Sequence, residues 1–368
     1  VGNPPYQALS KTEAFGYVTR TYALGKADLY AAFLERALQL VRPGGLSALL
    51  TMRGWMFLRQ LIELRKHLLH NKELCSLGDI DRGAFEDVPD EVLAVVMSVF
   101  CNALGDHNAV ALQPTPPSDR TRDVQRTARK RAGVLAQVAR YEFDPRGFAV
   151  VEGEPIVYWW TKEFLAEYGR TTTFRECHPA RQGLGTRNDT RFLRRWWEPQ
   201  LRRTWVPPPG MDISPPPVAW VPYIKGAAGQ RWYEPLDFVL LWEHAAVELR
   251  VWIEHYRIRA PGQYIKNEVF YFRRGVAFTT IGAEFSARIH RFASVFGEAG
   301  SSVFSKDLFS TVSTMNASRA RFVLESLNPS VNFKSEDVNR LPTFEVPGAP
   351  LIGATVHDAF VADERRRE

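Results

Sequence analysis

The stretch ADLYAAFLERALQLVRPGGLSALLTM, residues 27–52, sets the fold expected for the first part of the chain. Between Ala27 and Val41, apolar residues recur at positions 29, 30, 33, 34, 37, 38 and 41, the spacing of a helix with one apolar face. Arg42-Pro43-Gly44-Gly45 then stops the helix. The short apolar run Leu46–Met52 that follows is typical of a buried strand.

The next residues continue this alternation. Their patterns predict a helix over 57–69 and strands over 74–80 and 92–100. The order helix, strand, helix, strand, strand predicts an α/β sheet whose strands are mostly parallel.

A boundary is expected near residue 112, because prolines cluster at 113–117 and a polar, basic stretch follows. Residues 113–150 are therefore interpreted as a basic linker or helical connector. From 151 to 345 the sequence is rich in aromatic residues and irregular, which favours a separate α+β domain. Residues 346–368 are expected to form a frayed tail.

Within that second domain the patterns are weaker than in the first. Strands are expected at 269–272 and 275–281, and helices at 238–254 and 311–326.

Composition excludes several classes of protein. With 45% hydrophobic and 24% charged residues, the 368-residue chain is neither disordered nor fibrous. Three dispersed cysteines give no zinc spacing and no disulfide framework, so no metal is expected and a reducing, cytoplasmic location fits best. No apolar run approaches the roughly 20 residues of a membrane helix.

Charge is unevenly distributed. Residues 1–110 contain 11 Lys and Arg against 12 Asp and Glu, whereas residues 111–368 contain 36 against 29. The basic surplus of the second part suggests a polyanionic partner.

The string Asn3-Pro4-Pro5-Tyr6 carries the clearest chemistry. Its simplest interpretation is a turn. The two proline rings also stiffen the loop and fix its carbonyl groups. The Asn3 side-chain oxygen and the Pro4 carbonyl are then two acceptors for one exocyclic amino group, and the Tyr6 ring can stack on the heterocycle.

Adenine meets this description. Two acceptors that draw the amino hydrogens out of the ring plane favour a tetrahedral nitrogen, whose lone pair attacks a methyl sulfonium in line. An adenine inside a duplex must first be extruded to reach such a loop.

These four residues resemble the catalytic motif (N/D/S)PP(Y/F/W) of the amino-group DNA methyltransferases that use S-adenosylmethionine. The resemblance implies a Rossmann-like methyltransferase domain in which Asn3 and Pro4 bind the adenine amine, Pro5 stiffens the loop and Tyr6 stacks. It also implies a second stacking aromatic after the last strand, for which Phe100 is the candidate and Phe85 the rival. An ordinary core position is the alternative for both.

Several strings in the second part are similar to the target-recognition half of the phage-exclusion (BREX) adenine methyltransferases of the PglX family and their type IIG restriction-modification relatives. Examples are Gly153–Trp159, Arg181–Thr186, Val221–Gly226 and Ala299–Phe304. The resemblance implies N6-adenine methylation of double-stranded DNA in phage defence. The alternatives are a DNA-binding module without catalysis and a protein glutamine methyltransferase, which uses a similar NPPY.

In this family the Gly-rich turn that binds S-adenosylmethionine precedes the catalytic motif. The chain is therefore expected to be the C-terminal portion of a longer enzyme, with the cofactor motif upstream, and to hold the cofactor poorly alone. An N-terminal methyltransferase fragment and other phage-defence proteins are the partners that this interpretation implies.

Residues 170–203 contain nine Arg against three acidic residues, interleaved with aromatic residues. Such a mixture suits phosphates and base edges, and a solvated face is the alternative. The residues expected to contact DNA are Arg181, Arg187, Arg191, Arg194 and Lys225.

Two further groups are expected to be inert. His67 and His70 lie three apart on a predicted helix without a third metal ligand. Glu86, Asp87, Asp90 and Glu91 form an acidic stretch without a nuclease pattern, so no cleavage activity is expected.

Overall fold

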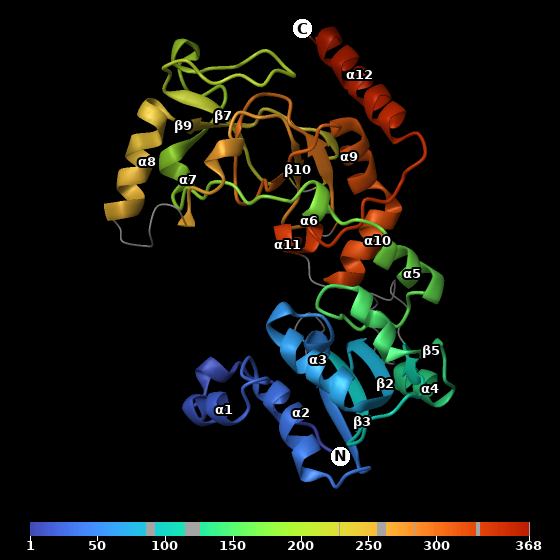
Figure 1. Ribbon diagram of the computed structural model, residues 1–368. Helices are drawn as coiled ribbons and strands as arrows, with labels where there is room; N and C mark the ends of the chain where they lie inside the picture. Colours follow the sequence, from blue (N-terminus) through green and yellow to red (C-terminus); the bar gives the residue numbers. More distant parts are fainter. Residues whose placement is uncertain are drawn as a thin grey trace. The chain divides into compact units, whose positions relative to one another are not determined.

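The computed structural model describes residues 1–85, 93–114, 126–227, 229–255, 263–282, 284–328 and 332–367 (Figure 1). These residues form two compact units, Val1–Arg170 and Thr171–Glu368. The sequence predicted boundaries near residues 112 and 150. All three sheets mix parallel and antiparallel strands, so the chain is a mixed α/β protein.

The first unit is built on a five-stranded sheet with the order β1-β3-β2-β4-β5. Its strands are β1 (Leu46–Met52), β2 (Glu73–Arg82), β3 (Ala94–Cys101), β4 (Ala109–Leu112) and β5 (Arg140–Phe143). Its helices are α1 (Phe15–Thr21), α2 (Leu29–Leu40), α3 (Ile62–Asn71), α4 (Arg126–Leu135) and α5 (Lys162–Arg170), with 3-10 turns η1 (Leu9–Lys11), η2 (Arg53–Met56), η3 (Arg59–Leu61) and η4 (Pro145–Val150).

The prediction that this sheet is mostly parallel is wrong. Strand β3 runs antiparallel to both β1 and β2, and β5 runs antiparallel to β4, so β2 and β4 form the one parallel pair among these described strands. The eleven residues between Arg82 and Ala94 are too few for the helical crossover that parallel neighbours require. Because β1 and β2 both oppose β3, they point in the same direction and end at the same edge.

Local sequence explains α2 and β1, which match the predicted helix and strand. The Asp28 side chain accepts a hydrogen bond from the Tyr30 backbone N–H, as an N-cap residue does. After the helix, Gly44 has a φ of +72°, which glycine adopts without strain. The apolar faces of α2 and α3 are buried, including Leu34, Leu64 and Leu68.

The second unit contains two four-stranded sheets, β13-β10-β11-β8 and β12-β7-β9-β6. The strands are β6 (Leu193–Arg195), β7 (Trp220–Ile224), β8 (Trp232–Tyr233), β9 (Phe238–Leu241), β10 (Val276–Phe278), β11 (Ala287–Ile289), β12 (Val295–Phe296) and β13 (Ser302–Val303). The helices are α6 (Phe174–Cys177), α7 (Asp189–Phe192), α8 (Glu243–His255), α9 (Leu308–Asn316), α10 (Ser318–Leu327), α11 (Ser335–Val338) and α12 (Ala349–Arg367), with 3-10 turns η5 (Leu201–Arg203) and η7 (Glu268–Phe270).

Three expectations for this unit fail where tertiary pairing overrides local pattern. Residues 238–241, expected to begin a helix, form β9 because they pair with both β6 and β7. Residues 268–270 form a 3-10 turn in place of a strand, and Phe270 and Tyr271 pack in the core. The helix expected over 311–326 is broken at Ala317, whose backbone is extended.

The C-terminal residues are not frayed in the part that is described. Helix α12 packs on α9 and β8, and the Phe360 ring stacks on Tyr233 with a centroid separation of 5.4 Å.

Candidate functional site

The Asn3–Tyr6 loop leaves the first sheet at the edge where β1 ends. The Gly2 N–H donates to the Ala48 carbonyl at 3.0 Å, and the Leu50 N–H donates to the Gly2 carbonyl at 3.0 Å. Gly2 therefore runs parallel to β1, opposite Leu49. Ligands of open α/β sheets bind outside the carboxyl ends of the strands, which is where this loop lies.

The Asn3 and Tyr6 side chains contact each other. The Tyr6 hydroxyl donates to Asn3 Oδ1 at 2.8 Å and also lies 3.3 Å from the Leu50 carbonyl. Asn3 is exposed, Pro4 is buried and the Tyr6 ring is half-buried. Burial raises the pKa of Tyr6, so its hydroxyl stays protonated at neutral pH.

Acceptor capacity remains in this loop. An amide oxygen has two lone pairs, of which Tyr6 occupies one on Asn3. Within the described residues, no group donates to the Pro4 carbonyl. An exposed amide oxygen and a neighbouring carbonyl are the pair of acceptors that an exocyclic amine requires.

The N-terminus of helix α2 contacts the residues that follow the loop. Asp28 Oδ1 accepts from the Gln7 N–H at 3.1 Å, and the Leu29 N–H donates to the Gln7 carbonyl at 3.0 Å. The Tyr30 ring meets the Tyr6 ring edge-on, with centroids 6.4 Å apart. These roles of Asp28 and Tyr30 were not predicted, although an Asp directly before an apolar helix is typical of an N-cap.

The two candidate stacking aromatics occupy different environments. Phe100 is 1% exposed, pairs with Ser47 at the start of β1 and packs on the buried ring of Trp55. Phe85 is half-buried and lies just after β2, at the edge where β1 also ends. Phe100 is therefore closed to a ligand, whereas Phe85 lies at the same sheet edge as the loop.

The Gly183-Leu184-Gly185 string packs inside the second unit, where a Cβ on Gly183 would lie 1.9 Å from the Phe296 carbonyl oxygen. Gly183 thus allows close packing of two backbones, and Gly185 makes room for the Glu298 carboxylate.

The five basic residues chosen from the sequence all lie in the second unit. Three already have acidic partners: Arg187 pairs with Glu298 at 2.9 Å, Arg191 with Glu248 at 2.6 Å and Lys225 with Asp189 at 2.6 Å. All six side chains are partly exposed. The surface is thus less positive than the count of arginines suggested.

The other two differ. The Arg194 guanidinium lies 5.7 Å from the centre of the Trp220 ring and lines a cavity of about 340 Å³ with Glu198, Gln200 and Arg203. Arg181 is half-buried and pairs with Ser302 through its backbone, and its Nε is buried without a hydrogen bond.

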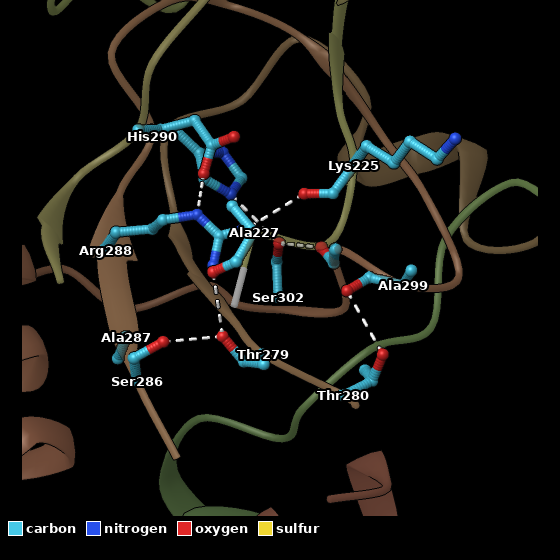
Figure 2. Close-up of polar contacts among 12 residues, drawn as sticks. Lys225, Ala227, Thr279, Thr280, Ser286, Ala287, Arg288, His290, Ala299 and Ser302 are labelled. Atoms are coloured by element: carbon cyan, nitrogen blue, oxygen red, sulfur yellow. Dashed lines mark hydrogen bonds and ion pairs between the residues drawn. The ribbon is translucent and has the colours of Figure 1, made fainter. Parts of the chain in front are cut away.

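A buried polar cluster positions Lys225 (Figure 2). The fully buried Arg288 forms an ion pair with Glu234 and donates to the Lys225 carbonyl at 2.8 Å. Burial raises the pKa of Glu234 to about 7, against the opposing effect of Arg288. His290 contacts Ser302 Oγ at 2.9 Å, and burial lowers its pKa to about 3.

The remaining candidates were expected to be inert. His70 contacts Glu154 at 2.7 Å, and His67 contacts Asn71. Within the described ranges, no group of three or more His, Cys, Asp or Glu residues is arranged to hold a metal ion. Glu86, Asp87, Asp90 and Glu91 lie outside the described residues. None of the helices that are described has the length and apolar character needed to cross a membrane.

Comparison with known proteins gives consistent matches. Residues 1–85 match the family model of the Eco57I restriction-modification methylase. The adenine-specific methyltransferase PglX of Lacticaseibacillus casei (strain Zhang) is 28% identical over 364 residues, and BrxX of Escherichia coli O9:H4 (strain HS) is 24% identical over 356. These alignments cover 93% and 94% of this chain but only 29% and 28% of the relatives.

The fold has a counterpart among solved structures. The Type IIL restriction-modification enzyme MmeI in complex with DNA aligns with a TM-score of 0.51 and 9% identity, over 94% of this chain and 44% of MmeI. This likeness concerns the fold alone.

Proposed function

We propose that this chain, which belongs to the PglX/BrxX and restriction-modification family of adenine-specific methyltransferases, contributes the base-binding edge and the target-recognition part of a DNA N6-adenine methyltransferase. The chain spans less than a third of the length of its curated relatives, so the activity of the whole protein is part of the proposal. Its setting would be bacterial phage defence or restriction-modification.

One observation carries the catalytic part: Asn3 and Tyr6 are in contact at the carboxyl edge of β1. In the proposed reaction, Asn3 Oδ1 and the Pro4 carbonyl oxygen each accept a hydrogen bond from one amino N–H of an extruded adenine. This removes electron density from conjugation with the ring and turns the nitrogen lone pair toward the methyl donor. Tyr6 covers one face of the base.

Phe85 is proposed as the second aromatic near the base, in place of Phe100. Its position after β2 supports this choice, as does the burial of Phe100 under Trp55. S-adenosylmethionine would supply the methyl group as a co-substrate. The role proposed for the described residues of this chain is to bind and orient the adenine amine.

The second part of the proposal concerns DNA. Arg187, Arg191, Arg194 and Lys225 would contact phosphates of double-stranded DNA. Arg187, Arg191 and Lys225 would exchange their carboxylate partners for phosphate oxygens. In this proposal, the first compact unit, Val1–Arg170, belongs to the methyltransferase part and the second, Thr171–Glu368, to target recognition.

Mapping of methylated adenines in the host genome tests the function with the protein as it exists. A strain that carries the wild-type gene should show N6-methyladenine at one recurring sequence. A strain that carries Asn3→Ala should lose it, because removal of one acceptor costs about 100-fold or more in rate. Persistent methylation in the Asn3→Ala strain would refute the assignment, as would loss of glutamine methylation on a release factor with the DNA unchanged.

A further inference from the structure

A largely buried arginine, Arg53, lies at the same sheet edge as the Asn3–Tyr6 loop. Arg53 directly follows β1, and its Nε lies 2.8 and 2.9 Å from the two carboxylate oxygens of Asp79 on β2. The Arg53 side chain is 11% exposed and that of Asp79 is fully buried. Sequence analysis gave no role to either residue.

Arg53 is connected to the proposed base site through adjoining contacts. Tyr6 approaches the Leu50 carbonyl three residues before Arg53. The Tyr30 ring contacts the Tyr6 ring and also lies beside Gly54, the residue after Arg53. A Cβ on Gly54 would be 3.3 Å from the Tyr30 hydroxyl. Arg53 therefore lies between Leu50 and Gly54, which approach Tyr6 and Tyr30 of the proposed base site.

The guanidinium is held in one orientation. Tyr158 donates its hydroxyl hydrogen to Asp79 Oδ2 at 2.7 Å, which fixes the carboxylate that receives Arg53. The Arg53 guanidinium carbon also lies 4.9 Å from the centre of the Phe57 ring and 5.7 Å from that of Trp159. A side chain that is fixed in advance loses little entropy when it binds a ligand.

Its donors are only partly used. The two contacts with Asp79 both involve Nε, and within the described residues neither η nitrogen has a hydrogen-bond partner. A buried ion pair is weak support for stability, because desolvation offsets most of the attraction. This pair instead leaves an end-on fork of η N–H groups, a geometry that matches two oxygens of one phosphate.

We propose that Arg53 binds the DNA phosphodiester next to the extruded adenine, with Asp79 and Tyr158 as positioning residues; this rests on the proposed function. A phosphate is favoured over a base because every extruded nucleotide brings its phosphates to this edge, whatever the sequence. Arg53 would thus hold the backbone of the nucleotide whose base Asn3 and Tyr6 receive.

The test combines a protein change with a DNA change. The purified protein is titrated by fluorescence anisotropy with duplexes of the mapped sequence, in which single phosphates beside the target adenine are replaced by uncharged methylphosphonate. With wild-type protein, one such replacement should weaken binding about tenfold, as expected for the loss of one charge-assisted contact. Arg53→Gln should bind the native duplex about tenfold more weakly and lose nothing further on the methylphosphonate duplex.

Two variants separate binding from folding. Arg53→Gln leaves Asp79 without its counter-charge, so the double variant Arg53→Gln/Asp79→Asn, which removes both charges, is tested beside it. The control is Arg59→Gln, an exposed arginine six residues on whose guanidinium lies 4.0 Å from the Glu152 carboxylate. It should bind both duplexes like the wild type.

The outcomes are distinct. The proposal would be overturned if the Arg53 variants bound the methylphosphonate duplex still more weakly than the native duplex. It would also be overturned if the affinity lost in Arg53→Gln depended on a guanine, as shown by its replacement with 7-deazaguanine. Failure of the wild-type protein to bind any duplex would instead refute the proposed function itself.

Discussion

Tyr6 donates its hydroxyl hydrogen to Asn3 Oδ1 at 2.8 Å, so the ring expected to cover a base also contacts the amide expected to hold its amine. This bond orients the Asn3 side chain and leaves the second lone pair of the oxygen available for the amine of the proposed adenine. The two side chains therefore form one preorganised unit.

Tyr6→Phe and Tyr6→Ala separate these two roles. Loss of the hydroxyl alone removes one hydrogen bond worth about 1 kcal/mol, so methyl transfer should fall about fivefold. Tyr6→Ala also removes base stacking, worth about 1–3 kcal/mol, and should fall a further tenfold or more. Single-turnover methylation rates measure both. Equal rates for the two variants would contradict a stacking role.

Asp28 should stabilise the loop through its oxygens, with no need for its charge. Asp28→Ala removes the acceptor for the Tyr30 and Gln7 N–H groups and should lower stability by about 1 kcal/mol. Burial raises the pKa of Asp28, so its contribution to stability is complete below the unfolded value and falls as the pH rises. Asp28→Asn should therefore match or exceed wild-type stability at pH 7 in thermal unfolding.

Arg65 is expected to be essential for the first unit. This buried residue donates to the carbonyls of Trp55, Leu58, Gly153 and Glu154. Arg65→Met leaves these acceptors unsatisfied and should cost about 3 kcal/mol or more in urea unfolding. Arg59→Met, at an exposed position, should change stability by less than about 0.5 kcal/mol. Similar losses would contradict the assignment.

His290 should make the second unit sensitive to acid. Its folded pKa is lowered to about 3 by burial, whereas the unfolded value is about 6.5. Between these values only the unfolded chain binds the proton, so stability is complete above pH 6.5 and is lost as the pH falls. Between pH 7 and 5, the wild type should lose about 2 kcal/mol more than His290→Gln.

The titration of Glu234 does not affect the comparison of wild type with His290→Gln. Its folded pKa is raised to about 7, so its contribution is complete below about pH 4.5 and is lost as the pH rises through 7. Because Glu234 is present in both proteins, its effect cancels in the difference.

Charge reversal tests the DNA surface. Arg191→Glu/Lys225→Glu should weaken binding to duplex DNA at least tenfold and lower the slope of log affinity against log salt by about 2. Arg321→Glu, in α10, is the control at a site outside the proposed surface. Unchanged affinity in the double variant would favour a solvated face without DNA contact.

Sequence alone predicted the elements whose patterns are local. The α2 helix and the β1 strand follow from the capping Asp28 and the glycine turn after the helix, all within 26 residues. The direction of β3 depends on a pairing across the sheet, and the choice between Phe85 and Phe100 depends on burial under Trp55. Neither the direction of β3 nor the burial of Phe100 can be predicted from the spacing of residues in the sequence.

The site shows the same division. Asn3 and Tyr6 could be proposed from the sequence because their motif is contiguous. Arg53 and Asp79 are 26 residues apart, and they meet only because β1 and β2 end together. The acids that neutralise the arginines, such as Glu248 and Glu298, come from segments about 57 and 111 residues away.

The attachment of Gly153, Glu154 and Tyr158 to Arg65 and Asp79 determines where this protein can be recombined. Exchange of the proposed recognition half between relatives requires a junction that leaves these contacts within one parent. A crossover at residue 150 would take Gly153 and Glu154, which accept from Arg65, from the other parent. It would do the same to Tyr158, which donates to Asp79. A crossover between Arg170 and Thr171 keeps them matched.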